Sequence, residues 1–348
     1  MPVSHADGES QMKFGVFDFH AVPPTTNPYD VVVHGLEQAV VAESAGFHEV
    51  WLPEHNGRAY GMVGNAVVAA AAIAAATNRI RIATAVTRLP LHHPVHLAED
   101  LAYVDILSGG RIDWGVGKGY DKLEFSTYGV PFEEREERWE ETFDAVQQIW
   151  RSKRTLYKGQ FFEFGDAELL PYPLQRPTLP IYAMVSQNDQ SVIWAAERLL
   201  PIAVGSGPNW DDVKHKLELY QETAEAAGYG PIEVSETLAR CWQLKQVHVA
   251  STTERAVEEF REGLMWYFEA LGNRAMFGFS KESEPYEYYM RHESVLVGSS
   301  NKVGESLAKY HEHTGMQNVI CFFNIGGQPH QQVVNAMNQF GEDIIPAL

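Results

Sequence analysis

The chain of 348 residues contains only two cysteines, Cys241 and Cys321. Two cysteines are too few for a disulfide framework, and neither belongs to a CxxC pair or another metal-binding spacing. They stand in Arg-Cys-Trp and Ile-Cys-Phe, so we expect buried thiols in a reducing compartment. The spacing of residues along the chain therefore predicts no metal site.

Long apolar runs and basic residues are also scarce. The longest apolar run, Ala66 to Ala76, falls short of the ~20 residues that a membrane-spanning helix needs, and no cleavable apolar segment follows Met1. The 27 Lys and Arg residues are outnumbered by 46 Asp and Glu, which gives a formal net charge of -19. Nucleic acid and anionic membranes would repel such a chain. We therefore expect a soluble, cytoplasmic protein that binds neither.

What the sequence does contain is an alternation of short β-rich runs with amphipathic stretches of helical length. Strands are expected at Lys13–Phe19, Glu49–Pro53, Ile80–Val86, Ile112–Gly117, Pro180–Val185, Ile202–Gly205, Cys241–Val247 and Asn318–Phe323. Helices are expected at Tyr29–Ala45, Asn65–Ala76, Pro94–Leu107, Phe132–Trp150, Asp189–Arg198, Asp211–Ala227, Thr253–Leu271, Lys302–Thr314 and Pro329–Ile345. Eight strands, each followed by a helix, predict an α/β fold of the (β/α)8 TIM-barrel class. One domain would span 12–348, after a flexible N-terminal segment at 1–11.

Three segments depart from this simple alternation. Thr155–Pro180 is an insertion before the fifth strand, with a hairpin-like stretch LYKGQFFEFG and a proline-rich return. Met276–Glu293 is aromatic and charged without clean periodicity, which indicates either a lid-like loop or an ordinary long loop. The Ala-rich helix Asn65–Ala76 has small side chains around its circumference, so it is either buried or at a contact between subunits. We favour a contact between identical subunits.

Polar residues follow the second strand directly. Pro53 stops the hydrogen-bond ladder of Glu49–Pro53, so Glu54 and His55 would stand at the carboxyl end of that strand. In α/β barrels this end carries the active site. His55 is therefore either a functional residue or a side chain that merely satisfies backbone groups in a loop.

Two further strand ends suggest ligand contacts. At the end of the fourth strand, Gly115, Gly117 and Gly119 alternate around one cation, Lys118, although glycines at strand ends also simply make turns. After the fifth strand, the polar segment Ser186–Ser191 leads into a helix. The first N–H groups of a helix favour an anion, but these polar side chains are equally suited to capping the helix.

These motifs resemble the bacterial luciferase-like flavin monooxygenase superfamily, most closely its luciferase α-subunit type. The resemblance extends from Met12 to the C-terminus. It is carried by MKFGVF, AESAGFHEVWLPEH, GNAVVAA, TAVTRLPLHHPVHLAEDLAYVDILSGGRIDWGVGKGYDKLEF, WAAERLLP and TGMQNVICFFNIGG. It implies a TIM barrel, dimerisation through barrel helices, and reduced flavin bound at the carboxyl ends of the strands.

The resemblance also implies roles for individual residues. His55 would lie beside the flavin ring and support a C4a-peroxyflavin, since an imidazole can donate or accept a proton near neutral pH. The companion position often holds a second histidine, and here it is Asn56, which removes a proton relay. Lys118 takes the position of the basic residue that binds the flavin phosphate, and Asn188 and Ser191 would face the same phosphate.

Other positions are implied to line the flavin site. Relatives carry a non-prolyl cis peptide at the place of Ala85-Val86, beneath the flavin ring. Gly117 stands where the luciferase α-subunit has a reactive cysteine, so no thiol chemistry is expected there. Phe17, Phe19 and Trp242 are further pocket candidates, with plain core packing as the alternative for each of these three aromatic residues.

The expected function is oxygenation of a largely apolar organic substrate by reduced FMN and O2. The resemblance implies that a separate NAD(P)H:flavin reductase supplies the reduced FMN, and the lack of a G-x-G-x-x-G fingerprint after a strand fits this. The chain would act as a homodimer. Light-emitting aldehyde oxidation, Baeyer–Villiger oxidation and hydroxylation all stay open. Two alternatives are a deazaflavin-dependent oxidoreductase of the same barrel and a non-catalytic flavin-binding protein.

Overall fold

A computed structural model describes residues 12–186, 188–271, 285–291, 293 and 295–348. The flexible segment expected at 1–11 lies outside these residues, as do 276–284 and 292 of the lid-like stretch. None of the helices in the described part is both long and apolar enough to cross a membrane.

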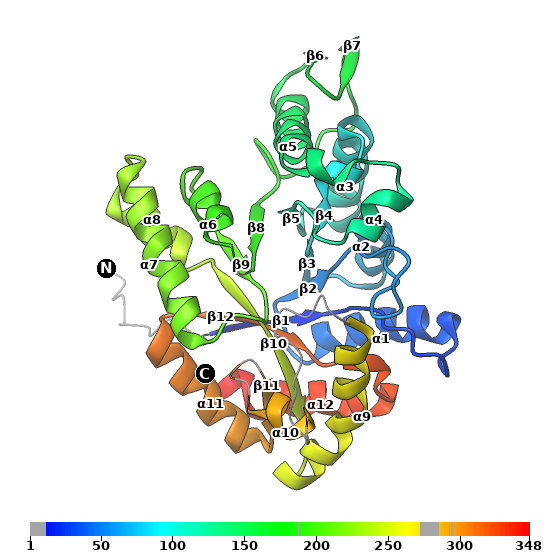
Figure 1. Cartoon of the computed structure of the whole chain (residues 1–348), viewed down its shortest axis with the longest axis vertical. Helices are drawn as coiled ribbons and strands as arrows, with labels where there is room; N and C mark the ends of the chain where they lie inside the picture. Colours follow the sequence, from blue (N-terminus) through cyan, green and yellow to red (C-terminus); the bar gives the residue numbers. More distant parts are fainter. Residues whose placement is uncertain (1–11, 187, 272–284, 292, 294) are drawn as a thin grey trace, which may run out of the picture.

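Eight parallel strands close a barrel, which confirms the predicted fold class (Figure 1). They are β1 (Lys13–Phe17), β2 (Glu49–Leu52), β3 (Arg81–Thr84), β5 (Ile112–Gly117), β8 (Ile181–Val185), β9 (Ile202–Val204), β10 (Trp242–Val249) and β12 (Asn318–Phe322). Each strand pairs with the next in this order, and β12 pairs back onto β1. Because every strand is parallel, all eight carboxyl ends meet at one mouth of the barrel.

Helices cover the outside of the barrel, at the positions that the sequence predicts. They are α1 (Pro28–Ser44), α2 (Ala66–Ala76), α3 (Pro94–Ser108), α5 (Arg135–Arg151), α6 (Asp189–Ala196), α7 (Trp210–Ala226), α9 (Thr253–Leu271), α11 (Ser300–Thr314) and α12 (His330–Asp343). Side chains of Asn27, Asn65 and Ser299 accept hydrogen bonds from the first N–H groups of α1, α2 and α11. Gly109 and Gly315 end α3 and α11 in the left-handed conformation.

Several short elements were not predicted. They are β4 (Thr87–Arg88), α4 (Lys122–Thr127), α8 (Pro231–Leu238), α10 (Pro285–Met290) and β11 (Val295–Gly298), together with four described 3-10 turns at Leu89–Leu91, Phe132–Glu134, Ile325–Gly327 and Ile345–Ala347. Helices of six to eight residues are too short to show a clear period. β11 pairs only with the second half of β10, outside the closed barrel.

The insertion before the fifth barrel strand contains the expected hairpin. Its strands, β6 (Thr155–Lys158) and β7 (Glu163–Ala167), pair antiparallel and project beyond α5, at the top of Figure 1. In the stretch read as a lid or long loop, the described helix α10 packs on α9 through a stacked pair, Phe268 and Tyr289. The lid itself stays a prediction.

The third strand is interrupted where the sequence predicts a continuous strand, Ile80–Val86. β3 ends at Thr84, the Ala85-Val86 peptide bond is cis as the resemblance implies, and the chain resumes as β4. The Thr84 side chain bridges to β5, because its hydroxyl accepts from the N–H of Gly115 (2.9 Å) and donates to the carbonyl of the same residue (3.0 Å). A Cβ at Gly115 would overlap the Thr84 carbonyl, so only glycine allows this approach.

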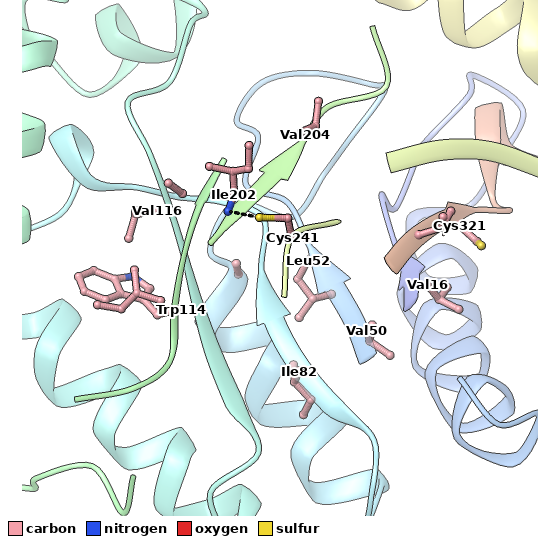
Figure 2. Packing of buried hydrophobic residues seen from close by; sticks show 14 of the residues in the cluster. Val16, Val50, Leu52, Ile82, Trp114, Val116, Ile202, Val204, Cys241 and Cys321 are labelled. Carbon is pink, nitrogen blue, oxygen red and sulfur yellow. Dashed lines mark hydrogen bonds between the residues drawn. The ribbon is translucent and has the colours of Figure 1, made fainter. Parts of the chain in front are cut away.

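Strand side chains alternate between two apolar layers. Outward residues such as Val50, Leu52 and Ile82 pack between barrel and helices (Figure 2). Inward residues such as Trp51 and Trp242 fill the barrel, with ring centroids 5.5 Å apart. Trp242 is therefore a core residue, which is the alternative given for it above.

Both cysteines lie in the outward layer, as buried free thiols (Figure 2). The Cys241 sulfur accepts a hydrogen bond from the N–H of Ile202 (3.4 Å), and Cys321 on β12 is paired in register with Val16 on β1. Burial raises the pKa of Cys241 to about 12 and raises that of Cys321 well above its usual value. The prediction of buried thiols is confirmed.

Candidate active site

A pocket of about 370 Å³ opens among the carboxyl ends of the barrel strands. Its walls are mostly apolar and aromatic, with a few charged groups, which is typical of a site for a small organic ligand. All seven site residues predicted from the sequence line it: His55, Ala85, Val86, Gly117, Lys118, Asn188 and Ser191. Phe17 and Phe19 line it too.

The imidazole of His55 is held by a buried carboxylate. Its Nδ1 lies 3.0 Å from Oε1 of Glu124 on α4, and the N–H of Asn56 donates to the same oxygen (3.1 Å). A carboxylate can only accept, so Nδ1 carries the proton. Nε2 is then the ring nitrogen left to accept a proton or a hydrogen bond from a ligand.

The same carboxylate belongs to a buried charge network. Nη1 of Arg88 lies 2.8 Å from Oε2 of Glu124, and its Nε lies 3.6 Å from Oε2 of Glu54. Glu54 also accepts hydrogen bonds from the backbone N–H groups of Ala66 and Arg88 and lies 2.9 Å from Nε2 of His92. Both carboxylates and the guanidinium are at most 2 % exposed. Two anions thus share one cation away from water.

Charge pairing keeps both carboxyl groups ionised. Burial alone would raise the pKa of Glu54, but His92 and Arg88 outweigh it, so the pKa is lowered. Burial likewise opposes ionisation of Glu124, whereas His55, Arg88 and the Asn56 N–H lower its pKa below the usual value. Near neutral pH the network therefore holds fixed negative charge behind the imidazole.

A second ion pair fixes α4, the helix that carries Glu124. Arg58, in the loop after β2, donates two hydrogen bonds to Asp121, at 2.6 and 2.7 Å. Asp121 caps α4 by accepting from the N–H of Leu123 (3.0 Å). The loop after β2 and the start of α4 are thus joined, which places Glu124 against His55.

Asn56, at the companion position to His55, is turned toward the rim. Its Nδ2 donates to the hydroxyl of Tyr128 (2.8 Å), and it does not line the pocket in the described part of the chain. Its side chain therefore does not extend the His55 site.

Lys118, another residue of the pocket wall, is paired. Its Nζ lies 2.6 Å from Oε2 of Glu136 and 5.1 Å from the ring centroid of Trp139. Trp139 packs in turn on Trp194 of α6, at 4.2 Å between centroids. Lys118 thus reaches toward α6 but carries a half-exposed carboxylate as its partner, which the sequence did not reveal.

The start of α6 forms the adjacent wall. Asn188 caps the helix, since its Oδ1 accepts from the N–H of Gln190 (2.8 Å), so its oxygen has the capping role given above as the alternative. Asp189 points away and pairs with Lys216 (3.1 Å) and His215 (3.2 Å), as its charge requires if an anion binds here. Ser191, in the first turn of α6, lines the pocket.

Glu124 and Arg88 were not among the predicted site residues. Glu124 lies in GYDKLEF, seven residues after Gly117, and no motif in the sequence distinguishes it from a surface carboxylate. Arg88 follows a strand that the sequence pattern ends at Val86. Only the folded structure shows which buried charges of opposite sign lie next to one another.

Replacing Arg88 with leucine should lower the free energy of unfolding by about 3–5 kcal/mol at neutral pH, because Glu54 and Glu124 lose their shared cation. Because folding lowers the pKa of both carboxyls, their ionisation stabilises the folded wild type at pH values above the usual carboxyl pKa of 4.5. This contribution is lost as the pH falls through the pKa values of the folded state. Without Arg88 the carboxyls protonate at higher pH, so the deficit should be smaller at pH 5 than at pH 7.5.

Urea unfolding at the two pH values measures this difference. Arg154→Leu is the control, because Arg154 and its partner Asp166 are both largely exposed and such pairs contribute little. Equal midpoints for the two variants at pH 7.5 would show that the buried network does not stabilise the fold.

Comparison with known proteins places this site in a family. The family model for luciferase-like monooxygenases matches residues 12–317. The alkanal monooxygenase alpha chain of the Kryptophanaron alfredi symbiont is 26% identical, covering 97% of this chain and 98% of the relative. Monooxygenase RslO1 from Streptomyces bottropensis has a TM-score of 0.85 at 26% identity, covering 97% of this chain and 99% of that one. The oxygenating constituent of 3,6-diketocamphane monooxygenase from Pseudomonas putida, a Baeyer–Villiger enzyme in complex with FMN, shares the fold with a TM-score of 0.83 at 20% identity, with 97% and 99% covered. The chain belongs to the luciferase-like monooxygenase family.

Proposed function

We propose that this protein is an FMN-dependent monooxygenase that oxygenates a largely apolar organic substrate. The observation that carries the proposal is one pocket that is lined both by groups suited to bind an anion and by groups suited to hold a proton. Lys118 and the start of α6 form the first, and His55 with Glu124 forms the second. When bound there, reduced FMN supplies the electrons that activate O2.

The residues present fit a flavin phosphate. Lys118 offers an ammonium group and Ser191 a hydroxyl, and both residues line the pocket together with Asn188, which is a donor set suited to a phosphate monoester. At Gly117 an added Cβ would press on the Val86 side chain, so a flat wall forms beside Ala85 and Val86. These residues would hold the phosphate and one face of the ring.

The chemistry assigned to this chain's own residues is proton handling and exclusion of water. His55, with its Nδ1 proton on Glu124, can accept or return a proton at Nε2. Glu124 is a positioning residue that fixes the ring and its tautomer. Phe17, Leu244 and Leu271 line the pocket and would cover an apolar substrate from water.

The electrons would come from a separate NAD(P)H:flavin reductase, as the resemblance implies. The competing proposal is a deazaflavin cofactor in the same pocket. The absorbance and mass of the cofactor that copurifies with the protein distinguish the two. O2 uptake that requires an added reductase and FMN would support the two-component scheme, and a bound deazaflavin would overturn it.

Lys118→Ala should weaken binding of reduced FMN by about 1.5–3 kcal/mol, roughly tenfold to a hundredfold, because a charge-assisted contact to the phosphate is lost. Affinity for riboflavin, which has no phosphate, should hardly change. Glu136→Gln should act in the opposite direction, since Glu136 competes with the phosphate for Lys118. Anaerobic titration of the three proteins with both flavins measures the effect, and equal losses for both flavins in Lys118→Ala would refute the phosphate assignment.

His55→Ala should still bind reduced FMN, since the proposed phosphate contacts are made by Lys118 and Ser191, but oxygenation should slow by a factor of about 10²–10⁴. An alkanal and a bicyclic ketone are suitable trial substrates, because the relatives' names carry those chemical types. More of the O2 consumed should appear as hydrogen peroxide. Asn56→Ala is the matched control, since that side chain turns to Tyr128.

Glu124→Gln tests the positioning role separately. It should bind FMN normally, slow oxygenation less than His55→Ala does, and shift the pH profile of the rate. If His55→Ala oxygenates the substrate like the parent, the catalytic assignment is wrong. If the parent binds flavin but none of these proteins oxygenates either substrate or alters flavin reoxidation, a flavin carrier is the better description.

We further propose that two copies associate through α2 and α3. Val68 on α2 and Tyr103, Ile106 and Leu107 on α3 are large apolar side chains left exposed on two helices that pack together. Val68→Asp should convert the dimer into a monomer without unfolding it, because it places a charge in an apolar contact. Light scattering after size-exclusion chromatography measures the mass, with Leu156→Asp on the exposed hairpin as control. A parent chain that is monomeric at micromolar concentration would contradict the proposal.

A further inference from the structure

Two histidines and a glutamate meet between the first and the last helix of the barrel. His34 and Glu37 lie one turn apart on α1, and His330 begins α12. Nε2 of His330 lies 3.1 Å from Oε2 of Glu37, and the rings of His34 and His330 are stacked with centroids 4.1 Å apart. One donor atom from each residue lies within 4.8 Å of the other two. This cluster does not line the pocket described above.

We propose that His34, Glu37 and His330 bind one Zn²⁺ ion that joins α1 to α12. Imidazole nitrogen and carboxylate oxygen are both ordinary zinc ligands, at about 2.0–2.2 Å. Tetrahedral geometry then puts the donor atoms roughly 3.3 Å apart, close to the separation already seen between His330 and Glu37. Water supplies the fourth ligand, since the cluster is only partly covered.

The stacked ring of His34 has to turn for this ligation. Nitrogen lone pairs lie in the ring plane, so two parallel rings cannot both direct theirs at one ion. The torsion that turns an imidazole about its Cβ–Cγ bond has a broad minimum, and His34 is partly exposed. Ligation therefore requires this ring to rotate, in addition to the amide rotations described next.

A buried amide supports the ligand role of His330. Nε2 of Gln38 donates to Nδ1 of His330 (3.1 Å), and Nδ2 of Asn324 donates to Oε1 of Gln38 (3.1 Å). The proton of His330 therefore sits on Nε2, directed at Glu37, and the ion takes its place. Nδ1 of His330 then carries the proton. Rotation of the Gln38 and Asn324 amides turns the Gln38 oxygen toward Nδ1, so the ring nitrogen that does not bind the ion donates to an acceptor, as in most ligating histidines.

Binding would stabilise the closed barrel. α1 packs against α12, which brings together helices from near the two ends of the chain (Figure 1). The unfolded chain holds His34 and Glu37 far from His330, so an ion that binds all three favours the folded state by mass action. Mg²⁺ and Ca²⁺ prefer oxygen ligands and should not substitute.

The test uses the full chain, freed of metal by a chelator, with Zn²⁺ as the probe. We expect one Zn²⁺ per chain after dialysis, measured by elemental analysis, and a higher thermal midpoint with Zn²⁺ but not with Mg²⁺. Co²⁺ should give the visible absorption of a tetrahedral site. Neither readout involves flavin or turnover, so the outcome is independent of the proposed oxygenase activity.

Single substitutions assign the ion to the cluster. His34→Ala, Glu37→Gln and His330→Ala should each weaken Zn²⁺ binding at least about tenfold. His313→Ala should not, because His313 on α11 pairs with Asp211 at another surface. Glu37 is the exposed member and His34 is partly exposed, so their variants answer the question even if His330→Ala fails to fold. No bound Zn²⁺ in the parent, or undiminished binding in His34→Ala and Glu37→Gln, would overturn the proposal.

Discussion

The region around the pocket depends on one buried cation, the guanidinium of Arg88. Its two carboxylate partners come from different parts of the chain: Glu54 follows β2, and Glu124 lies on α4. Charges buried this deeply have lost their water, so each depends on its oppositely charged neighbours. The positions of the β2 end, of β4 and of α4 are therefore coupled, and His55 takes its orientation from that arrangement.

Glu54 extends the same constraint to the surface of the barrel. Its carboxylate accepts the N–H of Ala66, the first residue of α2, while also facing His92 beyond β4. The amino end of α2 is thus fixed by a group from the active-site mouth. Since the exposed side of α2 is the proposed subunit contact, pocket and contact surface share one structural element.

The sequence predicts the barrel well because alternation with periods of two and 3.6 residues is a local property. Once eight parallel strands are assigned, their carboxyl ends must meet, so residues as distant as His55, Lys118 and Ser191 are expected at one mouth of the barrel, where the pocket lies. The break after Thr84 could not be seen in this way. It depends on the close approach of Gly115, which is a contact between strands and leaves no periodic trace.

The sequence also could not predict which charged side chains pair with one another. Lys118 looked like an isolated cation, yet Glu136 from α5 neutralises it, and Glu124 reaches His55 from a helix too short to predict. The cluster of His34, Glu37 and His330 has no recognisable spacing, since one ligand lies almost a chain length from the others. Such pairs form when helices dock, and only the folded structure brings them together.

If oxygen is activated in the pocket, as proposed, the burial of both cysteines has a consequence. A thiol is oxidised mainly through its thiolate, and burial keeps Cys241 and Cys321 protonated and covered. Peroxide that escaped from the pocket would therefore meet no reactive thiol. Met184, by contrast, lines the pocket, and the sulfoxide formed when its thioether is oxidised can be reduced again. Oxidative damage would thus begin with a reversible oxidation of Met184 in the pocket wall.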